Sequence, residues 1–131
     1  ILIELVKYPY IYTIQLLKMN LTFAYIFLII AILLEVLGTS FLKETNGFTR
    51  LYPSLFCIAA FCACLYLMSH TMQFIPVGVT YATWSGLGIV AVSAIAVIKY
   101  KQIPNIPTTI GLILIVAGVI IVNLMNDIDV K

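Results

Sequence analysis

Charged side chains are scarce in this sequence. Lys, Arg, Asp and Glu make up 9% of its 131 residues, whereas a typical soluble domain contains about 25%. None of the four occurs between Arg50 and Lys99, a stretch long enough for two membrane spans of about 20 residues each. The net charge of +2 comes from dispersed cations, which argues against nucleic-acid binding. A soluble globular protein is excluded, and a membrane protein is expected.

Motifs for catalysis, metal binding or cofactor binding are also lacking. The sequence has no nucleophile–base pair, phosphate-binding loop or metal-ligand cluster, so we expect neither an enzyme nor a metal or cofactor site. Its three cysteines, Cys57, Cys62 and Cys64, fall in one apolar segment. Cys62 and Cys64 would lie roughly 200° apart on a helix, which favours packing over a disulfide or a shared metal.

Long apolar runs fill most of the chain. Hydrophobic residues make up 63% of it, and the mean hydropathy is +1.16. The runs predict an all-α membrane protein with four spans, at about residues 21–42, 53–72, 78–98 and 108–125. We expect a loop over 99–107, and no soluble domain fits between the spans. Because four packed helices fill their own centre, an oligomer is expected.

Residues 1–18 form a separate segment in this prediction. The long apolar run starts after Met19, and Lys7 within the leader is unlike a secretory signal peptide. We expect a hydrophobic extension over 1–18 and a four-helix membrane domain over 19–131. The odd-numbered loops carry four of the seven Lys and Arg residues, or four of five without residues 1–18. In the second case the positive-inside rule places these loops in the cytoplasm.

Glu35 is the only formally charged side chain in the predicted span 21–42. A carboxylate within a span costs about 2.5 to 3.5 kcal/mol on insertion scales, so it marks an ion, proton or substrate pathway. Ala31 and Gly38 on the same helical face would let a helix or a bulky solute approach, and Thr39 offers a hydroxyl. The alternative is a protonated Glu35 that only donates a hydrogen bond to a neighbouring helix.

Aromatic residues on the third span suggest what Glu35 attracts. Tyr81 and Trp84 are three residues apart and share a helical face. Aromatic ring faces attract a cation by about 0.5 to 2 kcal/mol. Beside a carboxylate they favour a cation site, while packing or interfacial anchoring is an equal alternative. On the second span, Phe61 and Cys64 share a smooth face that would line an apolar cavity or pack in the core.

Two pairs of glycines lie within the spans. Gly86 and Gly88 predict a bend in the third helix or, equally, close helix packing. Gly111 and Gly118 are seven residues apart on one face of the fourth helix. Such a face favours tight contact between helices, and we expect it at a dimer interface.

Four segments together resemble a known family. They are LLEVLGTSFLK at 33–43, NGFTRLYPS at 46–54, IPVGVTYATWSGLGIV at 75–90 and GLILIVAGVIIVN at 111–123. In this order they resemble the small multidrug resistance exporters, over nearly everything after Met19. The segment around Glu35 is similar to the quaternary-ammonium branch, because the guanidinium branch typically has Trp where Gly38 stands.

The resemblance implies an antiparallel homodimer in the bacterial inner membrane that exports lipophilic cations in exchange for protons. Glu35 would then bind both proton and substrate, and Tyr81 and Trp84 would form an aromatic wall. Gly86 and Gly88 would form a kink. The other expected substrate-binding residues are Ala31, Gly38, Thr39, Phe61 and Cys64, and those of the dimer interface are Gly111 and Gly118. A guanidinium or small-metabolite exporter, and a subunit active only as a heterodimer with a paralogue, remain alternatives.

Overall fold

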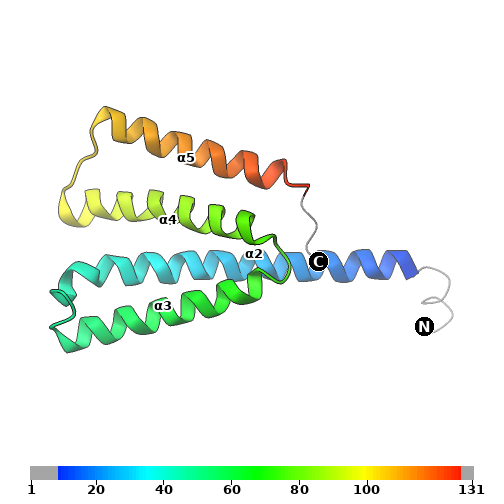
Figure 1. The fold of residues 1–131 in the computed structure, drawn as a ribbon, viewed down its shortest axis with the longest axis horizontal. Coiled ribbons are helices and arrows are strands. Elements are labelled where there is room, and N and C mark those ends of the chain that lie inside the picture. The colour runs from blue at the N-terminus through cyan, green and yellow to red at the C-terminus, as the bar shows by residue number, and fades with distance from the viewer. Residues whose placement is uncertain (1–8, 128–131) are drawn as a thin grey trace.

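Residues 9–127 are described by a computed structural model, with side chains from residue 21 onward. They form four α-helices and one short 3-10 turn, and no strand (Figure 1). These elements are α2 (Pro9–Leu42), η1 (Lys43–Thr45), α3 (Leu51–Thr71), α4 (Val77–Tyr100) and α5 (Ile106–Leu124). All four helices are long and apolar enough to cross a membrane. The predicted four-span, all-α architecture is confirmed.

Helix α2 is longer than the predicted first span. Its 34 residues extend about 51 Å at 1.5 Å per residue, whereas the hydrocarbon core of a bilayer is about 30 Å thick. In Figure 1 its first part projects beyond the other helices. The predicted boundary at residue 19 thus falls inside a helix. The separation of residues 1–18 from the rest stays a prediction, and residues 1–8 lie outside the described chain.

The loop predicted over 99–107 is shorter than expected at both ends. Lys99 and Tyr100 complete α4, and Lys101, whose backbone is left-handed with φ 57°, caps its C-terminal end. At the other end α5 begins at Ile106, because the Asn105 side chain caps it by accepting a hydrogen bond from the Thr108 backbone N–H. The prediction that Lys99 belongs to the loop was therefore wrong.

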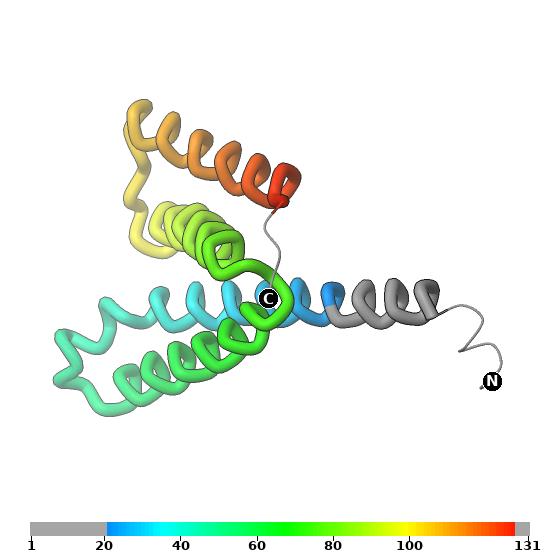
Figure 2. The backbone as a smooth tube through the Cα atoms, turned by 45° about the vertical axis from the view of Figure 1, so that its right-hand side comes forward, coloured from blue at the N-terminus to red at the C-terminus, as the bar shows by residue number. Residues whose placement is uncertain are grey.

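The helices lie in the order α3, α2, α4, α5 across the molecule (Figures 1 and 2). Helix α2 packs against both α3 and α4, whereas α5 packs against α4. No residue of α5 is buried. Helix α2 is therefore the centre of the protomer, and α5 leaves most of its apolar surface uncovered.

Small residues bring α2 and α3 together. A methyl group added to Gly38 would lie 2.9 Å from Cε1 of Phe61, so the glycine allows the ring to rest on the α2 backbone. The Cys57 thiol donates to the Gly38 carbonyl at 3.2 Å. Further along, Ala31 and Cys64 are fully buried against each other. The prediction that cysteines pack between helices is confirmed for Cys57 and Cys64, whereas Cys62 is exposed.

Branched apolar side chains join α2 to α4. Leu28, Ile32 and Val36 form one buried row along α2 at the spacing of one helical face. Trp84 and Val92 of α4 pack against this row. Two adjacent faces of α2 therefore contact different neighbours, with small residues toward α3 and branched ones toward α4.

Gly86 sets the distance between α4 and α5. A methyl group added there would collide with Cγ2 of Val119 and lie 3.3 Å from Cγ2 of Ile115. One turn further along α5, the Asn123 amide donates to the Thr83 hydroxyl at 2.7 Å. Helix α4 runs without interruption through Gly86, so in this structure the glycine serves close packing, one of the two predicted roles.

Gly86→Ala is expected to lower the melting temperature of the purified protein. The new methyl group would push Val119 away, and overpacking of this kind costs about 1 to 3 kcal/mol. Thermal unfolding in detergent, followed by circular dichroism, measures the effect. Gly78→Ala is the matched control, because nothing lies within 4 Å of a methyl group added there. Equal melting temperatures for the two variants would contradict the close contact, and Val119→Ala should restore the Gly86→Ala protein.

Candidate functional site

A groove of about 430 Å³ lies between α2 and α4. Helix α2 contributes Glu35 and Thr39 to it, one turn apart. Helix α4 contributes the remaining residues: Tyr81, Trp84, Ser85, Gly88, Ile89, Val92 and Ser93. Its volume is in the range of small-molecule sites, about 300 to 1,000 Å³. The groove has largely apolar and aromatic walls and one carboxylate.

Glu35 is half-buried in this groove and carries its only formal charge. The Thr39 hydroxyl donates to Oε1 of Glu35 at 3.4 Å. Among the described side chains, no Lys or Arg forms an ion pair with Glu35, and no group of three His, Cys, Asp or Glu could hold a metal ion. When ionised, the carboxylate thus offers a negative charge that the described part of the protomer leaves unbalanced.

Two aromatic rings stand beside the carboxylate. The ring centroids of Tyr81 and Trp84 are 5.2 Å apart, with 58° between their planes. Tyr81 is 55% exposed, whereas Trp84 is partly buried against α2 and Cys64. The indole Nε1 of Trp84 is the one buried side-chain nitrogen or oxygen without a hydrogen bond in the described chain. The groove therefore combines a free ring face, a second ring held by packing and a carboxylate.

Four other predicted site residues lie outside the groove lining. Ala31, Gly38, Phe61 and Cys64 sit in the contact between α2 and α3. Helix geometry explains the division: at about 100° per residue, Ala31 and Gly38 lie about 40° and 60° to one side of Glu35, whereas Thr39 lies about 40° to the other. The structure brings together Glu35, Thr39, Tyr81 and Trp84, and a substrate-binding role for the other four stays a prediction.

Sequence reasoning did not single out four lining residues of α4. Ser85, Ile89, Val92 and Ser93 follow Tyr81 at four, eight, eleven and twelve positions, so they continue its helical face. Extending that spacing along the span would have found them. The Ser85 hydroxyl donates to the Tyr81 carbonyl, and that of Ser93 to the Ile89 carbonyl, each at 2.7 Å. Their oxygens remain able to accept hydrogen bonds from a ligand.

Comparison with known proteins identifies the family. The family model described as Small Multidrug Resistance protein matches residues 23–115. The chain belongs to the small multidrug resistance family. The matched range contains all of the groove lining, and the resemblance predicted from the four sequence segments is confirmed.

Individual relatives match over most of their length. The multidrug transporter EmrE of Escherichia coli is 46% identical over 102 residues, which cover 78% of this chain and 93% of the relative. The quaternary ammonium compound-resistance protein QacC of Staphylococcus aureus is 45% identical, covering 78% and 95%. The multidrug resistance protein EbrA of Bacillus licheniformis is 41% identical, covering 76% and 95%. With its four apolar helices, this family member is a multi-pass protein of the bacterial inner membrane.

Tyr81→Leu is expected to weaken the binding of tetraphenylphosphonium to this family member by about 2- to 30-fold. Loss of the ring face removes a cation attraction of about 0.5 to 2 kcal/mol. Quenching of the fluorescence of Trp84, the only tryptophan, measures affinity in detergent. Tyr66→Leu is the matched control, because Tyr66 is 65% exposed on α3 and lies outside the groove lining. Unchanged affinity in Tyr81→Leu would contradict the aromatic wall.

Proposed function

We propose that this chain exports lipophilic and quaternary ammonium cations from the cell in exchange for protons. The observation that carries the proposal is the groove in which Glu35 is the only charged group and two aromatic rings lie beside it. Relatives named as a multidrug transporter and as quaternary ammonium compound-resistance proteins support the same substrate class.

The groove lining suits cations with bulky apolar substituents. Ile89 and Val92 offer aliphatic surface, and the rings of Tyr81 and Trp84 can contact a delocalised or alkylated positive charge. Such a cation needs no fixed array of hydrogen-bond donors and acceptors, and most of the exposed surface of the lining is apolar. A guanidinium ion, by contrast, carries five or more N–H donors that each seek an acceptor. Lipophilic cations are therefore favoured over the guanidinium alternative.

Exchange of protons for cations follows because both ligands bind to the same carboxylate, Glu35. A proton on Glu35 removes the negative charge that attracts the cation, and a bound cation disfavours protonation in turn, so the two ligands compete. If the groove changes its open side only when Glu35 carries a proton or a cation, entry of protons drives export of the cation. The bend expected near Gly86 and Gly88 is the proposed moving element, and Gly88 already lines the groove.

We further propose that the working unit is an antiparallel homodimer. Helix α5 is apolar along its length, yet no residue in it is buried within the protomer. Gly111 and Gly118 have open space around them, with no atom within 4 Å of an added methyl group. A second copy packed on this face would cover it. We propose in addition that the two Glu35 carboxylates of the dimer face one cavity.

Glu35→Gln is expected to abolish cation uptake driven by a pH gradient. The amide keeps the size of the side chain but neither exchanges a proton nor attracts a cation by charge. Purified protein in liposomes, with an acidic interior and a fluorescent lipophilic cation outside, reports uptake. Asp127→Asn is the matched control, because it makes the same chemical change at an exposed residue beyond α5.

The same assay separates the alternatives. Full uptake by Glu35→Gln would refute proton-coupled exchange at this residue. Transport of guanidinium, but of no tetraalkylammonium ion, would favour the guanidinium exporter. Transport that begins only when a paralogous chain is reconstituted together with this one would favour the heterodimer.

Gly118→Leu is expected to reduce the dimer fraction by at least about tenfold. A leucine on the open face of α5 would keep the two helices apart, because close approach there requires small residues. Energy transfer between separately labelled protomers in liposomes measures the dimer fraction. Ala59→Leu on the exposed face of α3 is the control for a new leucine facing lipid. Loss of dimer in the control and not in Gly118→Leu would place the interface on α3 instead.

A further inference from the structure

Polar contacts join the C-terminal end of α2 to that of α4, outside the groove lining. The Lys99 ammonium donates to the Ser40 carbonyl at 3.0 Å, and the Tyr100 hydroxyl donates to the same carbonyl at 2.9 Å. Lys99 also forms an ion pair with Glu44 of η1 and lies 4.5 Å from the ring centroid of Phe41. Two helices that line the groove are therefore bound together at one end.

The position of Ser40 explains why these contacts form. The last four carbonyl groups of an α-helix have no partner within the helix, and Ser40 lies in the last turn of α2. Its carbonyl is satisfied from another helix, by a cation and a hydroxyl. A positive charge at a helix C-terminus is also favoured by the helix dipole. Lys99 thus caps the C-terminal end of α2 from a different helix, and it also forms the ion pair with Glu44.

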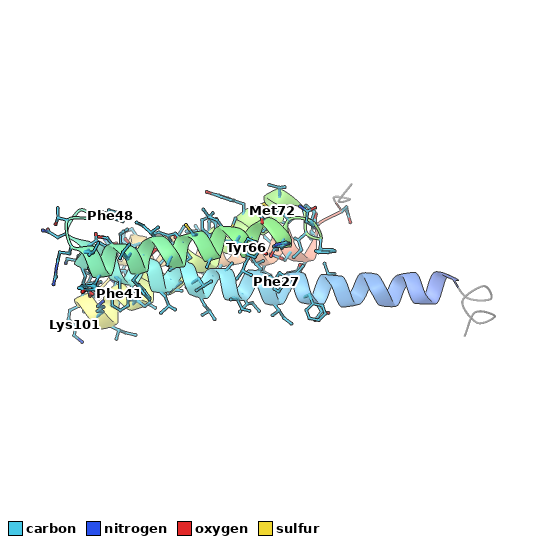
Figure 3. The ribbon with its side chains drawn as sticks, turned by 90° about the horizontal axis from the view of Figure 1, so that it is seen from below. Phe27, Phe41, Phe48, Tyr66, Met72 and Lys101 are labelled. Carbon is cyan, nitrogen blue, oxygen red and sulfur yellow. The ribbon has the colours of Figure 1, made fainter. Side chains whose placement is uncertain are left out.

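The end of the molecule carrying this cluster is rich in cations. Lys43 lies 4.8 Å from the centroid of the Tyr100 ring. Figure 3 shows Phe41 and Lys101 at this same end of the bundle, away from Phe27 and Met72. Glu44 is the one acidic side chain among them, and the only ion pair of the described side chains joins it to Lys99. Of the cations at this end of the described chain, only Lys99 therefore forms an ion pair with Glu44; Lys43 and Lys101 do not.

We propose that Lys99 and Glu44 form a clamp that closes this end of the groove, so that Lys99 must release Ser40 and Glu44 before the groove opens there. Ser40 directly follows Thr39, which lines the groove. On α4, Lys99 lies six residues beyond the lining residue Ser93, about 9 Å along the helix. Ser40 thus adjoins the groove, and Lys99 lies less than two turns beyond its lining. The proposal rests on the proposed function, in which the groove opens alternately at its two ends.

The clamp is tested by the accessibility of the groove near it. In protein lacking its native cysteines, Ser93→Cys places a thiol on the lining, and a water-soluble maleimide in nanodiscs reports how often this end is open. Glu44→Gln removes the ion pair, so we expect labelling about two- to fivefold faster, in line with an exposed pair. Lys99→Gln also removes the Ser40 contact and the stacking on Phe41, so we expect a larger increase.

Control variants separate the clamp from a general effect of charge. Lys101→Gln removes a neighbouring exposed cation, for which no ion pair exists among the described residues, and should leave labelling unchanged. Lys99→Arg keeps a charge that can reach Glu44, and should label at nearly the wild-type rate. Raised salt should reduce the difference between Glu44→Gln and wild type, because it screens the ion pair. A thiol at Val77, at the other end of α4, should react equally in all variants.

Two outcomes would overturn the clamp. One is unchanged Ser93→Cys labelling in both Glu44→Gln and Lys99→Gln. The other is an increase in Lys101→Gln as large as in Lys99→Gln. Glu44→Gln alters only an exposed side chain, so it remains informative if Lys99→Gln does not fold. Binding of tetraphenylphosphonium, measured in the same proteins, distinguishes failure of the two proposals. If the wild type does not bind it, the proposed function is refuted. If the wild type binds it and labelling is unchanged in the variants, only the clamp is refuted.

Discussion

A carboxylate inside a membrane-spanning helix is the constraint on which the rest of this protein depends. Glu35 cannot face hydrocarbon without a cost of a few kcal/mol, so its surroundings must offer polar groups, a ligand or a proton. Among the described side chains, the Thr39 hydroxyl donates to Glu35 at the long distance of 3.4 Å. The remaining stabilisation is left to what enters the groove. In the proposed exchange mechanism, this weak internal stabilisation leaves Glu35 able to bind a proton or a cation in turn.

The position of α2 between α3 and α4 follows from its two kinds of surface. Glycine and alanine on one side let the side chains of α3 reach its backbone, as Phe61 does at Gly38. Branched residues on the other side interdigitate with α4, as Ile32 does beside Trp84. Glu35 lies between these two surfaces, on the α4 side. A single helix therefore provides both the rigid contact and the open groove.

Backbone groups at the helix ends also form contacts that hold the protomer together. Backbone carbonyls at a helix end need partners, and near a membrane these partners are often side chains of neighbouring helices. Here the Ser40 carbonyl is satisfied from α4, while the Asn105 side chain satisfies the start of α5. The first contact joins two separate helices and the second is local. In the proposed clamp only the first contact is released when the groove opens, because it joins the two helices that line the groove.

The sequence by itself determined the four apolar spans, the intramembrane carboxylate and the shared helical face of Tyr81 and Trp84, because hydropathy and helical spacing are local properties of the chain. The tertiary structure decided which side of each helix meets which neighbour. It placed Ala31 and Gly38 against α3 rather than in the groove, since a rotation of about 40° to 60° around α2 is below what spacing alone resolves. Lys99 likewise looked like a loop residue until the fold brought the end of α4 to a carbonyl on α2, a contact between residues almost sixty positions apart.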